Sequence, residues 1–187
     1  MQVGLFFGSF NPIHIGHMII SNMVVQSTEL EQVWFVLSPQ NPFKQKATLL
    51  KEQERLHLIH LAIDDNPKLR VTDIEFRLPK PSYTIDTLTH LKEKYPQHSF
   101  SLIMGSDNID EIKEWKNGDF ILHNYKITVY KRSEITAIIH PNITYLDFPF
   151  LDISATFIRQ KIKEGYSMNY FLPENVWKYI EEYKLYK

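Results

Sequence analysis

The chain contains no cysteine and no glycine-rich nucleotide-binding motif of the common types. The absence of cysteine excludes a disulfide-stabilised scaffold and a thiol nucleophile, and it is typical of intracellular proteins. Neither Gly-x-Gly-x-x-Gly nor a Gly-Lys-Ser/Thr loop occurs. The usual dinucleotide and P-loop sites are therefore disfavoured.

The sequence also lacks a large net charge and a long apolar run. Its formal charge of −1 at pH 7 implies no general electrostatic attraction to nucleic acid or to an anionic membrane. No apolar segment approaches the length of a membrane span, and Met1 leads into a predicted strand without the basic segment of a signal peptide. We therefore expect a cytoplasmic protein with no nucleic-acid partner and no membrane partner.

Apolar, β-rich segments alternate with helical patterns along the whole chain. The expected strands are residues 2–7, 32–37, 69–73, 100–104, 126–130 and 143–146. The expected helices are residues 16–26, 50–64, 83–94, 108–123 (broken near Asn117-Gly118), 155–164 and 173–183, with Ser82 and Ser154 as N-caps and Gly165 as a stop. This alternation predicts an α/β fold, doubly wound, with a mainly parallel sheet and helices on both faces. Because 187 residues of ordinary composition contain no linker or repeat, we expect a single domain, 1–187.

The segment from Gly8 to His17 (GSFNPIHIGH) is the most distinctive in the chain. It follows a predicted buried strand, and it predicts a tight turn and then the first turn of a helix. A helix N-terminus offers unpaired N–H groups, glycines allow close approach of the backbone, and the imidazoles of His14 and His17 add hydrogen-bond donors. The segment therefore predicts a phosphate-binding site for a nucleotide.

Other histidine chemistry is not expected. Zinc at His14 and His17 is disfavoured because cysteine is absent and no His-Glu-x-x-His pattern occurs. His57 and His60 lie in an amphipathic helical pattern without a glycine turn, which predicts packing rather than binding.

Basic residues follow the second expected strand. Two prolines stiffen the segment 38–46 (SPQNPFKQK), which carries Lys44 and Lys46. Lysine here suits phosphate, although a solvated basic loop explains the same residues. Arg55, in the next helix, is predicted to be a solvated surface residue.

A carboxylate and an indole follow the fourth expected strand. Asp107, after Gly105-Ser106, can accept hydrogen bonds from ribose hydroxyls or can cap the following helix. Trp115 suits either the core or a surface on which an aromatic ring stacks.

A second phosphate-type cluster occupies residues 153–159 (ISATFIR). Ser154 is predicted to cap a helix that carries Thr156 in its first turn and Arg159 one turn further on. Hydroxyls, free N–H groups, the helix dipole and a guanidinium all suit polyphosphate. Capping alone accounts for Ser154 but not for the whole set.

Together these motifs resemble those of the bacterial nicotinate-mononucleotide adenylyltransferases, members of the H-x-G-H nucleotidyltransferase superfamily. The matching segments are Gly8–His17, Pro42–Lys44, Ser82–Leu88 (SYTIDTL), Gly105-Ser106-Asp107 with Trp115, Ile153–Arg159 and the C-terminal helix. The resemblance implies a Rossmann-like fold and an enzyme of NAD biosynthesis. Its reaction would transfer the adenylyl group of ATP to nicotinate mononucleotide, giving deamido-NAD and pyrophosphate, with Mg²⁺ accompanying ATP and no metal site of the protein's own.

The resemblance also implies roles for individual residues. The catalytic residues would be His14, His17, Lys44 and Arg159. ATP would contact Gly8, Ser9, Phe10, His14, His17, Gly105, Asp107, Ile153, Ser154, Thr156 and Arg159. Nicotinate mononucleotide would contact Lys44, Thr84 and Trp115. Three positions depart from the family pattern: Asn11 stands where Asp is usual, Phe43 where His is frequent, and Ala155 where Ser is usual.

Three alternatives stay open at this point. Pantetheine-phosphate adenylyltransferases share the superfamily motif, but they are usually shorter, have Thr at the position of His14 and lack the SYTIDTL segment. An enzyme specific for nicotinamide mononucleotide, or for both mononucleotides, would carry the same motifs. The third alternative is a nucleotide-binding regulator without catalytic activity. Binding alone would not require His14, His17 and Arg159 together, so their presence argues against it. The sequence leaves the oligomeric state open.

Overall fold

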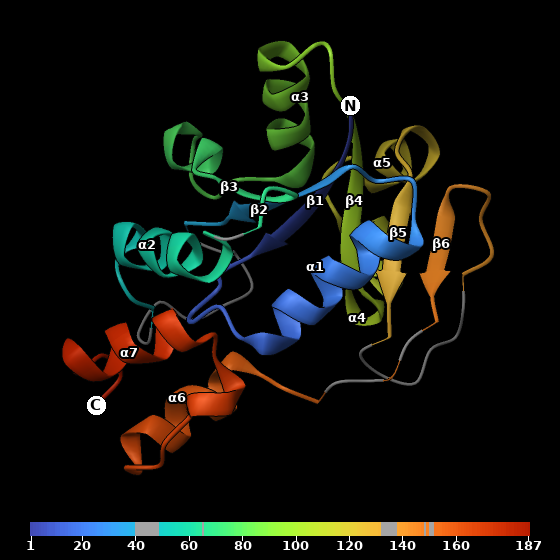
Figure 1. Ribbon diagram of the computed structural model, residues 1–187. Coiled ribbons are helices and arrows are strands. Elements are labelled where there is room, and N and C mark those ends of the chain that lie inside the picture. Colours follow the sequence, from blue (N-terminus) through green and yellow to red (C-terminus); the bar gives the residue numbers. More distant parts are fainter. Residues whose placement is uncertain (40–48, 65, 132–137, 148, 150–151) are drawn as a thin grey trace.

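The computed structural model describes residues 1–39, 49–64, 66–131, 138–147, 149 and 152–187 (Figure 1). At its centre lies a parallel sheet of six strands in the order β3-β2-β1-β4-β5-β6. The strands are β1 (Gln2–Gly8), β2 (Gln32–Leu37), β3 (Leu69–Thr72), β4 (Ser99–Gly105), β5 (Ile127–Tyr130) and β6 (Ile143–Leu146). The chain runs outward from β1 to β3 and then returns to place β4 beside β1, which confirms the predicted doubly wound arrangement.

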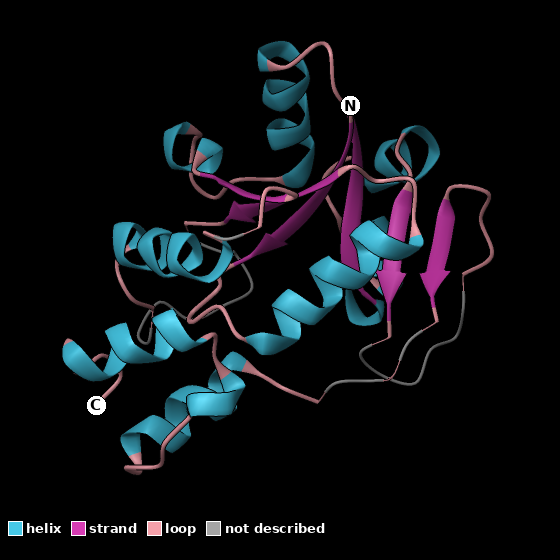
Figure 2. Cartoon of the chain, in the orientation of Figure 1, coloured by secondary structure: helices cyan, strands magenta, loops and turns pink. Residues whose placement is uncertain are grey.

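Helices cover both faces of the sheet (Figure 2). The α-helices are α1 (Ile15–Ser27), α2 (Glu52–Ile63), α3 (Thr84–Lys94), α4 (Ser106–Asp110), α5 (Gly118–Asn124), α6 (Ala155–Lys163) and α7 (Glu174–Glu182). Short 3₁₀ turns are η2 (Ile74–Arg77), η3 (Ile112–Glu114) and η4 (Asn169–Phe171). No helix in the described part of the chain combines the length and apolar character that crossing a membrane demands.

Alternation of side chains along the strands divides the core into two layers. In β1, Leu5 packs with α3, α4 and α5, whereas Phe6 packs with α1, α2, α6 and α7. Trp34 and Phe35 of β2 divide in the same way. Successive side chains of a strand point to opposite faces, so an uninterrupted apolar strand needs cover on both sides.

The sheet determines where a ligand can bind. Its order reverses between β1 and β4, whose carboxyl ends, at Gly8 and Gly105, lie at the same edge. In open sheets of this kind ligands bind beyond the carboxyl ends of the strands at such a switch point. Most of the predicted site residues follow β1 or β4 directly, or lie at the start of α6.

The structure corrects the prediction that Ser82 caps a helix. Tyr83 occupies the N-cap position of α3, and the Ser82 hydroxyl donates a hydrogen bond to Glu75 Oε2 at 2.8 Å. Glu75 is only 2% exposed, so its carboxylate needs donors that water cannot supply. The serine therefore donates to a buried carboxyl group rather than capping a helix end.

The helix expected over residues 108–123 is divided more finely than predicted. It forms α4, η3 and α5, and α4 begins at Ser106 with Gly105 as its N-cap, so Asp107 does not cap it. The predicted break near Asn117-Gly118 is confirmed: Asn117 is left-handed at φ 56°. A Cβ at Gly118 would lie 1.8 Å from the carbonyl oxygen of Ile112, so only glycine fits this crossing.

Candidate active site

The turn after β1 forms the floor of the site. Phe10 has φ 42°, a left-handed conformation that non-glycine residues rarely adopt, and its ring is buried. The ring centroid lies 5.0 Å from that of His17 and 5.3 Å from that of Phe35. A Cβ at Gly8 would lie 2.8 Å from the Phe10 ring, so glycine lets the ring fold back over the strand end. The strained backbone is thus held by aromatic packing.

His14 and His17 lie together at the start of α1. His14 is the N-cap residue, and its main-chain N–H donates to His17 Nδ1 at 3.1 Å. An Nδ1 that accepts a hydrogen bond carries no proton, so neutral His17 has its proton on Nε2 and can donate from there. The two ring centroids are 3.7 Å apart. The main chain therefore orients the imidazole of His17, which lies against the His14 ring at a tilt of 31°.

The N-terminus of α6 supplies the second group of polar atoms. Ser154 Oγ accepts the Phe157 main-chain N–H at 3.2 Å, which confirms the predicted cap. The guanidinium of Arg159 donates to Thr156 Oγ1 at 3.3 Å and to the carbonyl oxygen of Asn11 at 2.8 Å. Burial lowers the pKa of Arg159 from its ordinary value, and the nearby Tyr186 acts in the opposite direction. The guanidinium therefore joins α6 to the turn after β1.

These groups line a cavity of about 490 Å³ at the carboxyl edge of the sheet. Predicted residues on its wall are Gly8, Ser9, Phe10, His14, His17, Gly105, Asp107, Trp115, Ser154, Thr156 and Arg159. Their positions in the sequence extend from β1 to α6, so folding assembles the site from distant segments. Asp107 is the one carboxylate among the described residues that line it.

Two predicted residues are not brought to this wall, and a third lies outside the described residues. Ile153 and Thr84 are partly exposed and do not line the cavity. Thr84 opens α3, which packs on the same side of the sheet as Leu5. Lys44, with Pro42, Phe43 and Lys46, lies outside the described residues, so its predicted role stays a prediction.

An ion pair nevertheless links the start of α3 to the segment that carries Trp115. Lys116 Nζ lies 2.8 Å and 3.0 Å from the two carboxylate oxygens of Asp86. The same ammonium lies 4.9 Å from the centroid of the Tyr83 ring. Thr84 lies between Tyr83 and Asp86 in the sequence, so this contact ties the Thr84 segment to Trp115.

Arg55 is not the solvated residue that the sequence predicts. It is 1% exposed and donates to four carbonyl oxygens: those of Ser9 (2.6 Å), Ser38 (2.9 Å), Pro39 (3.1 Å) and Leu50 (3.1 Å). Its four acceptors are main-chain carbonyl oxygens. Every residue has such an oxygen, so the amino-acid sequence does not indicate that Arg55 is buried. The charge holds together the segments that follow β1 and β2.

A buried carboxylate explains much of the SYTIDTL segment. Glu75 accepts the hydroxyl of Ser82 and that of Thr87, each at 2.8 Å. Burial raises the pKa of Glu75, whereas hydrogen bonds from Thr87, Ser82 and Ser38 lower it by less. The acidic residue thus anchors the start of α3, and no sequence signal in that motif identified it.

Fold and site together define a nucleotide-binding protein of the nucleotidyltransferase class. A family model described as cytidylyltransferase-like matches residues 5–161, and the chain belongs to that family. Its relatives include a probable nicotinate-nucleotide adenylyltransferase of Flavobacterium johnsoniae, 48% identical over the whole of both chains. Another, of Cytophaga hutchinsonii, is 50% identical over all of this chain and 98% of the relative. The chain is thus a nucleotidyltransferase, and the expected family membership is confirmed.

A solved structure shares the fold. It is the nicotinic acid mononucleotide adenylyltransferase of Plasmodium falciparum complexed with NaAD, with a TM-score of 0.82 and 21% sequence identity. The match covers 99% of this chain and 97% of the other. The Rossmann-like α/β fold is therefore confirmed.

Proposed function

We propose that this chain transfers the adenylyl group of ATP to nicotinate mononucleotide, forming deamido-NAD and pyrophosphate. The observation that carries the proposal is the meeting of His14, His17, Thr156 and Arg159 in one cavity that also contains Trp115. Relatives named for this activity match the chain over its full length, which supports the choice of substrates.

In this proposal, the ATP phosphates lie between the starts of α1 and α6. Both helices are long enough to present several main-chain N–H groups and a partial positive charge. His17 would donate from Nε2, and Arg159 would donate from the guanidinium atoms directed away from Asn11. Asp107, at the end of β4, suits the ribose hydroxyls of the adenosine.

Nicotinate mononucleotide would occupy the part of the cavity beside Trp115. An indole face stacks well on a flat pyridine ring. Thr84 would act through the segment that Lys116 and Asp86 hold against Trp115, and Lys44 would meet a phosphate.

The reaction requires no general base. The acceptor phosphate is ionised at neutral pH, so the nucleophilic oxygen already carries its negative charge. The protein must hold two anions in line and stabilise the charge that develops on the departing pyrophosphate. In this proposal His17 and Arg159 do this. We expect direct transfer, and an adenylylated protein formed with ATP alone would contradict it.

We propose that a divalent ion, Mg²⁺, arrives with ATP as part of the substrate. Among the residues that the structure describes, no cluster of three or more His, Asp or Glu side chains could hold a metal ion. The donor set fits an ion carried by phosphate oxygens better than one held by the protein. When bound, it would neutralise part of the phosphate charge.

Pyrophosphate release with ATP and Mg²⁺ tests the proposal. Nicotinate mononucleotide, nicotinamide mononucleotide and phosphopantetheine are offered separately to the wild type, to His17→Ala and to the control His60→Ala, which alters an exposed residue of α2. We expect turnover with nicotinate mononucleotide, lost in His17→Ala and kept in His60→Ala.

The other outcomes separate the alternatives. Equal turnover with the amide would keep the enzyme class and remove the acid preference. Turnover with phosphopantetheine alone would support the pantetheine-phosphate alternative. ATP binding without release for any acceptor would support a nucleotide-binding regulator. A cytoplasmic location stays a prediction from the sequence.

A further inference from the structure

The chain reverses direction at its C-terminus. After α7 ends at Glu182, Lys184 adopts a left-handed conformation with φ 52°, and the Leu185 N–H donates to the carbonyl oxygen of Ile180 at 3.0 Å. This is the hydrogen-bond pattern of a Schellman motif, in which the left-handed position is usually glycine. The reversal packs Leu185 and Tyr186 against the core layer of α1, α2, α6 and α7.

Tyr186 reaches the turn after β1 from the other end of the sequence. Its hydroxyl donates to Asn11 Oδ1 at 2.9 Å, across 175 positions of sequence. The same oxygen accepts the Leu50 N–H at 3.2 Å. Asn11 is only 1% exposed, so bulk water cannot replace either donor.

Asn11 also contacts the proposed phosphate site directly. Its carbonyl oxygen accepts Arg159 Nη1, and the residue lies on the cavity wall. Tyr186 therefore holds the side chain of Asn11, while the main-chain carbonyl oxygen of Asn11 orients Arg159. Burial raises the pKa of Tyr186, and the charges of Arg159 and Arg55 lower it by less, so the hydroxyl keeps its proton and stays a donor at neutral pH.

We propose that Tyr186 is a positioning residue for adenylyl transfer. It fixes Asn11, and through Asn11 it fixes the guanidinium of Arg159 against the phosphates of ATP. The inference rests on the proposed function and deepens it, because it assigns a role at the ATP site to the penultimate residue of the chain. Phenylalanine would fill the same space, so the hydroxyl contributes the polar contact and the ring contributes the packing.

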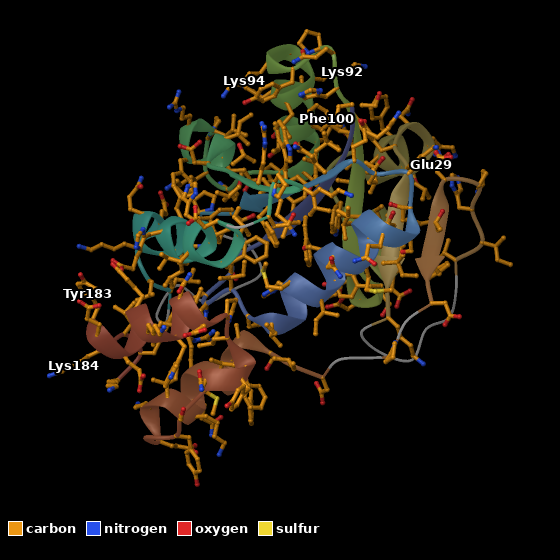
Figure 3. All side chains as sticks on the ribbon, viewed as in Figure 1. Glu29, Lys92, Lys94, Phe100, Tyr183 and Lys184 are labelled. Carbon is orange, nitrogen blue, oxygen red and sulfur yellow. The ribbon has the colours of Figure 1, made fainter. Side chains whose placement is uncertain are left out.

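The variant Tyr186→Phe isolates the hydroxyl. The matched control is Tyr183→Phe, the same chemical change on a ring that is 57% exposed and stacks on the Tyr179 ring at the surface (Figure 3). We measure kcat and KM for both substrates, the affinity for MgATP alone by calorimetry, and the thermal unfolding midpoint. Removing one net hydrogen bond should lower kcat/KM for ATP about fivefold and weaken MgATP binding, with KM for nicotinate mononucleotide unchanged. Because the contact is buried, the unfolding midpoint should fall by about 2–4 °C, so activity is assayed well below it.

A double-mutant cycle tests the route through Asn11. In an Asn11→Ala background, Tyr186→Phe should cause no further loss, because the acceptor is already absent. An equal loss in both backgrounds would overturn the route. Unchanged kcat/KM in Tyr186→Phe would overturn the proposal, as would a loss seen only at temperatures where the variant unfolds, or one that affects only KM for the acceptor.

These readouts separate the two proposals. If the wild type turns over and Tyr186→Phe equals it, the positioning role fails and the proposed function stands. If the wild type does not turn over, the proposed function fails, and the MgATP affinities still decide whether Tyr186 orients Arg159. Equal affinities in that case would refute the positioning role.

Discussion

The guanidinium of Arg55 donates to the main-chain carbonyl oxygen of Ser9 at 2.6 Å, across 46 positions of sequence. This contact joins α2 to the turn that follows β1. Because the same charge also binds carbonyl oxygens of Ser38 and Pro39, it fixes the ends of two neighbouring strands relative to one another. The floor of the nucleotide cavity thus depends on a residue that does not line it.

Arg55→Lys should destabilise the protein markedly. An ammonium has no planar fork and cannot reach four separate carbonyl oxygens, so buried acceptors lose their donors. We expect the free energy of unfolding to fall by about 2–4 kcal/mol, measured by urea denaturation at pH 7. The control is Arg70→Lys, an exposed residue of β3, which should change it by less than about 0.5 kcal/mol. Equal effects of the two changes would show that the buried contacts do not stabilise the fold.

Arg159→Lys should reduce catalysis while leaving the fold intact. The lysine keeps the charge but cannot donate to Asn11, to Thr156 and to a phosphate at the same time. We expect kcat/KM for ATP to fall about a hundredfold with an unchanged unfolding midpoint. Lys161→Gln, on the same helix and paired with Glu164, serves as the control and should keep full activity. Near-normal turnover of Arg159→Lys would exclude a directed role for the guanidinium.

Lys116→Gln should weaken the binding of nicotinate mononucleotide and leave the binding of ATP unchanged. It removes the contact with Asp86 that ties the start of α3 to Trp115. Because both side chains are largely exposed, the ion pair contributes little to stability, and we expect KM for nicotinate mononucleotide to rise about threefold. The difference from wild type should shrink in high salt. The control is Lys113→Gln, a change at an exposed position of the neighbouring turn, which should leave the KM for nicotinate mononucleotide unaltered. If Lys116→Gln instead raised the KM for ATP, the prediction that this contact supports acceptor binding would be wrong.

The buried Glu75 makes the free energy of unfolding depend on pH. Folding raises the pKa of this carboxyl from its ordinary value of 4.5, chiefly through burial, so the folded state retains the proton more strongly than the unfolded state. The contribution of Glu75 to stability is therefore greatest below pH 4.5 and declines as the pH rises through the raised value. Glu75→Gln, which keeps the shape and stays neutral, should become more stable relative to wild type over that range.

Urea denaturation of both proteins at a series of pH values from 4.5 to 7.5 measures this difference. The matched control is Glu93→Gln, a change at an exposed position of α3. A difference between Glu75→Gln and wild type that stays constant with pH would contradict the raised pKa.

Local signals were sufficient to predict the strands and many of the residues that line the cavity. Apolar runs bounded by turns located the boundaries of all six strands to within one residue, because a strand buried on both faces needs such a run. The cap at Ser154 and the break at Asn117 also depend on neighbouring residues alone. Most of the predicted ATP contacts line the cavity for the same reason: they follow strand ends or open helices.

Contacts between distant segments could not be predicted in this way. Ser82 has a good capping sequence, but the buried carboxyl group of Glu75 accepts its hydroxyl instead. Arg55 and Tyr186 find their partners in main-chain oxygens and in a side chain at the far end of the sequence. Nothing in their immediate surroundings distinguishes them from surface residues, so tertiary structure alone identifies them.

The separation of Asn11 from Tyr186 has a consequence for synthesis. The turn after β1 is synthesised 148 positions before Arg159 and 175 positions before Tyr186. The phosphate site can therefore form only after most of the sheet, and a chain shortened before α6 can build the strands yet lacks the groups that orient ATP. Nucleotide binding therefore reports that these distant segments have come together.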